Sequence, residues 1–99
     1  MVIIHVSVQV KEGVTGEFEQ LLRGVVEDAR KMAGCVKYDW YRVPDHPQQY
    51  VAYGEFDTKE NFEHYLRSAV VQRIGAELIP LLTAPPVFKH YEATILETG

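Results

Sequence analysis

The stretch from Gly54 to Val70 changes its hydrophobic period from that of a strand to that of a helix. At the change, Asp57 or Thr58 can cap the helix, because a side-chain oxygen there accepts hydrogen bonds from the free amides of the first turn. Glu60 follows Asp57 by three residues, which is the spacing of a capping box. A strand that runs directly into a one-sided helix predicts a sheet covered by helices. The apolar stripe of this helix is predicted to comprise Phe62, Tyr65, Leu66, Ala69 and Val70.

The other segments complete a regular order of strands and helices. Alternating apolar and polar side chains predict a first strand from Val2 to Val10. A helix capped by Thr15 follows and ends at Gly34. Further strands are predicted over 36–43, 50–56 and 87–96, and Gly75 is a candidate break in the second helix before a short continuation. This order predicts an α+β, ferredoxin-like βαββαβ domain over residues 1–99, with an antiparallel sheet and helices on one face.

The face of the sheet without helices is predicted to be apolar. A simple hairpin between the second and third strands pairs Tyr41 with Ala52 and Trp40 with Tyr53, although a bulge would change this register. Because 46% of the residues are hydrophobic, the chain has more apolar side chains than one sheet-and-helix layer needs. Such a face is too apolar to stay exposed to solvent, so a homodimer is expected. The residues predicted on this face are Ile3, Tyr38, Trp40, Val51 and Tyr53.

Charge and composition exclude several classes of function. The net charge is −4 and Lys and Arg do not cluster, so the electrostatic footprint of a nucleic-acid-binding protein is absent. No apolar run approaches the roughly 20 residues that span a bilayer, and the first residues lack the pattern of a signal peptide. Cys35 is the single cysteine, which fits a reducing cytoplasm. No two histidines have the helical spacing of a zinc site, so no metal is expected.

Three segments carry a resemblance to a known family. Gly34-Cys35-Val36-Lys37-Tyr38 follows the first helix, Gly13 precedes a helix that contains Phe18, and the segment from Phe56 to Ser68 has a similar pattern. In this order and spacing, the chain resembles the antibiotic biosynthesis monooxygenase family. The resemblance implies a dimeric α+β barrel with a pocket between sheet and helices. Members of the family include cofactor-independent oxygenases of quinols and polyphenols, isomerases of small sugar-like signals, and haem degraders.

The chain departs from the family at its usual polar positions. Where the family often has Glu-x-Trp at the end of the third strand, this chain has Gly54 and Phe56. In the His-Leu-x-Ser-x-His pattern of the second helix, Tyr65 and Val70 stand at the two histidine positions. Val6 stands where the haem degraders carry a polar residue, so the resemblance does not favour haem. The Leu and Ser of the helix pattern are retained as Leu66 and Ser68.

Tyr65 and His64 are the candidate catalytic residues. Tyr65 lies on the inward stripe at a family histidine position, and a phenol in an apolar pocket can orient a substrate or pass a proton. The alternative for Tyr65 is a core tyrosine whose hydroxyl reaches solvent or a backbone carbonyl. His64 is rotated about 100° from Tyr65 around the helix, so an exposed histidine or a dimer contact is its alternative.

Small and aromatic residues around the third strand are the candidate substrate-binding residues. Small side chains beside aromatic ones leave room for a planar ligand, whereas close packing of a helix on the strand is the alternative. The candidates are Tyr41, Tyr50, Ala52, Gly54, Phe56, Phe62 and Leu66.

The sequence and the resemblance together predict a cofactor-independent monooxygenase of a quinol or another small aromatic substrate. Such an enzyme needs a dry pocket and one base, so it requires no elaborate motif. Two alternatives stay open. The scaffold can serve as a non-catalytic dimeric protein that binds a small molecule or a partner, or as an isomerase of a small polar metabolite.

Overall fold

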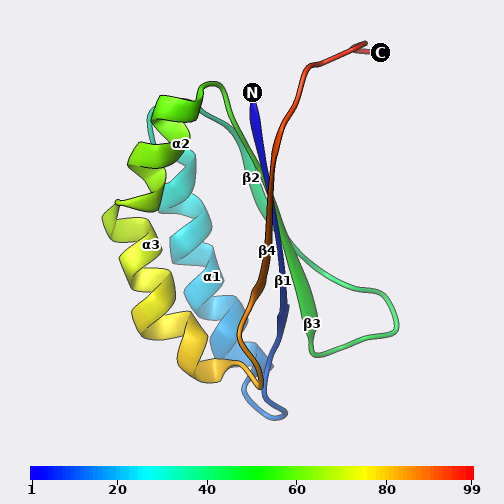
Figure 1. Cartoon of the computed structure of the whole chain (residues 1–99). Helices are drawn as coiled ribbons and strands as arrows, with labels where there is room; N and C mark the ends of the chain where they lie inside the picture. Colours follow the sequence, from blue (N-terminus) through cyan, green and yellow to red (C-terminus); the bar gives the residue numbers. More distant parts are fainter.

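A computed structural model describes residues 1–99, in which one four-stranded antiparallel sheet is covered by helices on a single face (Figure 1). The strands lie in the order β2-β3-β1-β4. The chain therefore has the predicted ferredoxin-like α+β fold. The elements are β1 (Val2–Gln9), α1 (Thr15–Arg30), β2 (Cys35–Arg42), β3 (Gln49–Phe56), α2 (Lys59–Leu66), α3 (Ala69–Arg73), a π-helical turn (Ile74–Leu78), a 3-10 turn (Ile79–Leu81) and β4 (Val87–Glu92).

The core lies between the sheet and the helices, as the two hydrophobic periods require. Every second residue of β1 from Val2 to Val8 is buried, because alternate side chains of a strand point to one face. The buried stripe of α1 runs from Phe18 to Ala29 at helical spacing. Thr15 is the first residue of α1 and makes no capping hydrogen bond, so its predicted capping role is wrong.

The second helical region breaks earlier than predicted. Thr58 caps α2, since its hydroxyl accepts a hydrogen bond from the Asn61 amide at 3.1 Å. The break lies between Leu66 and Ala69 rather than at Gly75, because the Ser68 hydroxyl donates to the Tyr65 carbonyl at 2.6 Å and caps α3. Beyond this break Ala69 is exposed and leaves the predicted inward stripe, whereas Leu66 is 42% exposed but still lines the space between sheet and helices. No helix is long and apolar enough to cross a membrane.

A register shift in β2 corrects the predicted pairing. The irregularity lies between Cys35 and Lys37, and beyond it Trp40 pairs with Ala52 and Tyr41 with Val51. A shift of one residue moves side chains to the opposite face of a sheet. The prediction that Tyr38 and Trp40 lie on the open face is therefore wrong, because both face the helices.

The open face of the sheet carries both apolar and polar side chains. Ile3, Val51 and Tyr53 lie there as predicted, and their paired positions on the neighbouring strands add Tyr41, Val87 and Tyr91. Polar side chains such as His5 lie between them. β4 ends at Glu92 instead of 96, because the last backbone hydrogen bond to β1 is from Ala93 to Met1.

Candidate functional site

A cavity of about 360 Å³ lies between the sheet and the second helical region. Fifteen of its eighteen lining residues are hydrophobic. The strand side chains Ile4, Val6 and Ala52 line it on the sheet side, and Ile74 and Leu78 of the π-helical turn line it on the helical side. The other lining residues are Val8, Phe18, Tyr38, Trp40, Tyr65, Leu66, Val71, Gly75, Ile79, Leu82, Pro86, Phe88 and His90.

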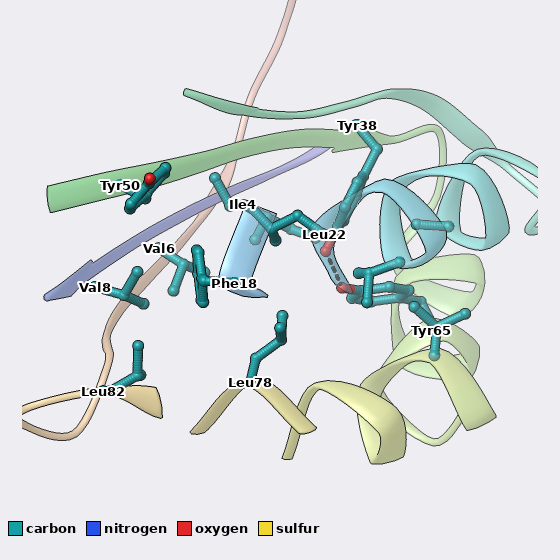
Figure 2. Close-up of a cluster of buried hydrophobic side chains, with 14 of the residues drawn as sticks. Ile4, Val6, Val8, Phe18, Leu22, Tyr38, Tyr50, Tyr65, Leu78 and Leu82 are labelled. Atoms are coloured by element: carbon teal, nitrogen blue, oxygen red, sulfur yellow. Dashed lines mark hydrogen bonds between the residues drawn. The ribbon is translucent and has the colours of Figure 1, made fainter. Parts of the chain in front are cut away.

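A pair of tyrosine hydroxyls is buried at one end of the cavity. The hydroxyl oxygens of Tyr38 on β2 and Tyr65 on α2 are 2.9 Å apart. Figure 2 draws the hydrogen bond between them as a dashed line. The two residues are only 3% and 5% exposed, so each hydroxyl depends on the other for its hydrogen bond. The rings also pack, with their centroids 5.9 Å apart. The pair thus places two polar groups in an otherwise apolar wall.

The environment of the pair keeps both phenols neutral. Burial raises the pKa of Tyr65 far above its ordinary value, and the neighbouring Tyr38 raises this pKa further. Burial also raises the pKa of Tyr38, and the Tyr65 hydroxyl opposes part of that rise. Either hydroxyl can donate within the pair, and when Tyr38 donates to Tyr65 the Tyr65 hydrogen is free to bond a ligand oxygen. The Tyr65 phenolate is too costly to form for this residue to act as a base.

The indole N–H of Trp40 is a third polar group at this end. Its Nε1 atom is buried and makes no hydrogen bond of normal geometry, although it favours the ionised form of the Tyr38 hydroxyl. The indole is held in place by the Phe18 ring, which packs edge-on at a centroid distance of 6.1 Å. A buried donor without a partner costs free energy, and a ligand oxygen would remove that cost.

His90 lies on β4 and lines the same cavity. Its ring packs edge-on against Phe62 of α2, with the centroids 4.9 Å apart. His90 and the neighbouring cavity residue Phe88 are both exposed, so the cavity opens toward solvent beside β4. The sequence alone does not indicate a role for His90. Its place depends on the pairing of His90 with Ile4 across two distant segments, which periodicity alone does not reveal.

Three of the predicted site residues line the cavity, namely Tyr65, Ala52 and Leu66. Phe56 and Phe62 do not line it but support the Tyr65 ring, since the centroids of Phe56 and Tyr65 are 4.9 Å apart and those of Phe56 and Phe62 are 6.3 Å apart. These two aromatic residues therefore fix the orientation of Tyr65 and contact no cavity space themselves.

The other predicted site residues lie elsewhere. The space above Gly54 is filled by the Tyr38 ring, since a methyl group on Gly54 would lie 3.3 Å from that ring. Tyr50 packs on Phe18 and donates a hydrogen bond to Glu19, outside the cavity. Tyr41 is on the open face of the sheet and 50% exposed, because of the register shift in β2.

His64, the second catalytic candidate, is exposed on α2 and does not line the cavity. This agrees with the alternative reading of His64 as a surface residue.

The cavity contains no carboxylate, lysine or arginine among its lining residues. A ligand that fits it is therefore apolar and uncharged over most of its surface, because burying an unpaired charge is costly. No group of three or more His, Cys, Asp or Glu side chains that could hold a metal ion occurs in the chain.

A second hollow of about 330 Å³ lies between α1 and β2 and is lined by charged side chains. Most of its charges are paired within the chain, because Arg30 pairs with Asp39 and Arg42 lies 3.6 Å from Glu19, whereas Arg23 makes no salt bridge. It is also more open than the apolar cavity. The apolar cavity is therefore the candidate functional site.

Comparison with known proteins agrees with the fold. The sequence profile of the family described as antibiotic biosynthesis monooxygenase matches residues 1–77. A Nitrosomonas europaea protein that is provisionally named an antibiotic biosynthesis monooxygenase superposes with a TM-score of 0.88 at 19% identity, over 96% of this chain and 100% of its own.

Two further structures show the same likeness. A Deinococcus radiodurans protein with the same provisional name has a TM-score of 0.86 and 25% identity over 100% of both chains. A conserved protein from Methanosarcina mazei Go1 has a TM-score of 0.88 and 22% identity, covering 94% of this chain and 92% of its own. No curated protein sequence matches this chain. The match of the sequence profile over most of the chain shows that this protein belongs to the antibiotic biosynthesis monooxygenase family.

Proposed function

We propose that this protein is a cofactor-independent monooxygenase of small aromatic substrates, with hydroquinones as the substrate class. The observation that carries the proposal is the apolar cavity with the Tyr38–Tyr65 hydroxyl pair and the unpartnered Trp40 N–H at one end. The provisional names of the structural relatives point to the same class of reaction.

The chemistry can be written with oxygen as the only co-reactant. A hydroquinone reacts with O₂ to give a hydroxyquinone and water: one oxygen atom joins the ring, the other leaves as water, and the substrate supplies the four electrons. The protein binds the ring, excludes water and stabilises the negative charge that develops on a ring oxygen when its proton is lost. Tyr65, as a neutral donor, and Trp40 would stabilise that oxygen.

The proposal is tested by oxygen consumption with metal-free protein and a panel of hydroquinones. Removing one hydrogen-bond donor to a developing oxyanion typically costs about 10² to 10³ in rate. Tyr65→Phe keeps the ring and deletes the hydroxyl, so we expect a loss of this size. Tyr91→Phe is the matched control, because Tyr91 is exposed on the open face of the sheet. A wild-type protein that consumes no oxygen with any hydroquinone would refute the monooxygenase proposal.

A non-catalytic ligand-binding protein is the second candidate. The raised pKa values of both cavity phenols favour it, because neither group supplies a base at neutral pH. Binding of hydroquinones without oxygen consumption would support this candidate. An isomerase of a polar metabolite is not favoured, since a lining with fifteen hydrophobic residues offers few hydrogen bonds to such a substrate.

A homodimer in a cytoplasmic setting is part of the proposal. The open sheet face presents Ile3, Tyr41, Val51, Tyr53, Val87 and Tyr91, and a second copy packed sheet to sheet would cover them. An obligate interface of this kind buries on the order of 2,000 Å² or more. Light scattering should give the mass of two chains, and a monomer at micromolar concentration would refute the barrel. The single unpaired cysteine, Cys35, fits a reducing compartment.

A further inference from the structure

Tyr38 and His90 reach the cavity from the two edge strands of the sheet, β2 and β4. His90 on β4, Ile4 on β1, Gly54 on β3 and Tyr38 on β2 form one row across the helix-covered face of the sheet, because each is paired with the next. With strands about 4.8 Å apart, the backbones of His90 and Tyr38 are about 14 Å apart. Between them the floor of the cavity is apolar.

Only one of the residues that line the cavity is suited to accept a proton from the substrate. The two phenols are held neutral and share one hydrogen bond, and the Trp40 indole is a donor only. Histidine is the side chain that most often acts as a general base, and His90 is the single histidine that lines the cavity. Its ring is oriented by the edge-on contact with Phe62.

We infer that His90 is the general base of the site, and that the substrate lies between His90 and the Tyr38–Tyr65 pair with one ring oxygen at each end. This inference rests on the proposed function and adds a residue that the sequence did not indicate. A free imidazole nitrogen of His90 takes the proton of one hydroxyl, giving a phenolate and an imidazolium, and the electron pair stays on the ring oxygen. The second oxygen, para to the first, lies with the Tyr38–Tyr65 pair, which stabilises the negative charge on that oxygen when it loses its own proton as the quinone forms. O₂ then reacts with the phenolate.

The first test measures oxygen consumption by two variants. His90→Ala removes the base and leaves room for added imidazole, whereas His90→Phe keeps a ring against Phe62 without a nitrogen. We expect both variants to lose about 100-fold or more in kcat, because general bases contribute about 10² to 10⁴. Added imidazole should restore part of the rate of His90→Ala only. His46→Ala is the matched control, since His46 is exposed in the β2–β3 loop away from the cavity.

A comparison of substrates shows whether His90 acts as a base or only packs against its neighbours. With halogenated hydroquinones, whose hydroxyls are more acidic, the loss in His90→Ala should shrink, because less help is needed to remove the proton. Variants that keep their rate within about threefold would overturn the inference. So would an equal loss with every hydroquinone and no rescue by imidazole, which would assign His90 a packing role.

The second test does not depend on oxygen chemistry. 4-Nitrophenol is bound under anaerobic conditions, and the visible absorbance of its phenolate reports whether the bound probe is ionised. We expect the wild-type protein to ionise the bound probe and His90→Ala to leave it largely neutral. Equal ionisation in both would overturn the role of His90 even if wild-type turnover were observed. Ionisation that depends on His90, without oxygen consumption, would support the base and refute the monooxygenase.

Discussion

The hydroxyl pair of Tyr38 and Tyr65 allows a quantitative test of how the site is built. Both residues are almost fully buried, and their oxygens are 2.9 Å apart. Tyr38→Phe or Tyr65→Phe leaves the remaining hydroxyl buried without its partner, and an unsatisfied group of this kind costs about 1–3 kcal/mol. When both hydroxyls are removed, no phenol is left unsatisfied, and replacing both partners with apolar groups can be nearly neutral. We therefore expect two destabilised single variants and a double variant that is within about 1 kcal/mol of the wild type.

Urea unfolding of the four proteins measures these differences. All four are compared at one protein concentration, because coupling between folding and dimer formation makes stability depend on concentration. The coupling energy of the double-mutant cycle should be at least about 1 kcal/mol and favourable to the pair. Additive single losses, with a double variant as unstable as their sum, would show that each hydroxyl interacts independently, for example with water in the cavity. That result would refute the inference that each of the two hydroxyls depends on the other for its hydrogen bond.

Three further changes test other parts of the structure. Ala52→Leu places a larger side chain at a buried position on the cavity floor, so hydroquinone binding measured by calorimetry should weaken at least about tenfold; unchanged affinity would place the ligand elsewhere. Gly34→Ala forces a Cβ against the Asp57 side chain at a positive φ of 78°, so thermal unfolding should show a loss of about 1–3 kcal/mol, and an unchanged Tm would contradict the strain argument. Burial and the hydrogen bond to Glu19 raise the pKa of Tyr50 to about 12. Because the unfolded phenol ionises near 10, this contribution to stability is complete below pH 10 and is lost as pH rises toward 12. The loss of stability between pH 10 and pH 12 should therefore be smaller in Tyr50→Phe than in the wild type. Identical stability-versus-pH profiles would argue against the raised pKa of Tyr50.

The sequence by itself determined the order of the elements and the fold. The period of two in β1 and the period of 3.6 in α1 are local properties of the side chains, so they identify each element and its buried face. The cap at Thr58 was also predictable, because capping depends on residues within one turn. Among the candidate site residues, Tyr65 and Ala52 line the cavity, because each lies on the inward face of its own element.

The tertiary structure decided which residues share the cavity. The register shift between Cys35 and Lys37 brought Tyr38 and Trp40 to the helices and sent Tyr41 to the open face, although no local pattern marks it. The Ser68 cap ended the helical stripe early, since a side-chain hydrogen bond competed with the continuing helix. His90 entered the cavity only through the pairing of β4 with β1, segments that are more than eighty positions apart. Strand register is fixed by packing of the whole sheet, so the faces of β2 and β4 follow from contacts that a single sequence does not display.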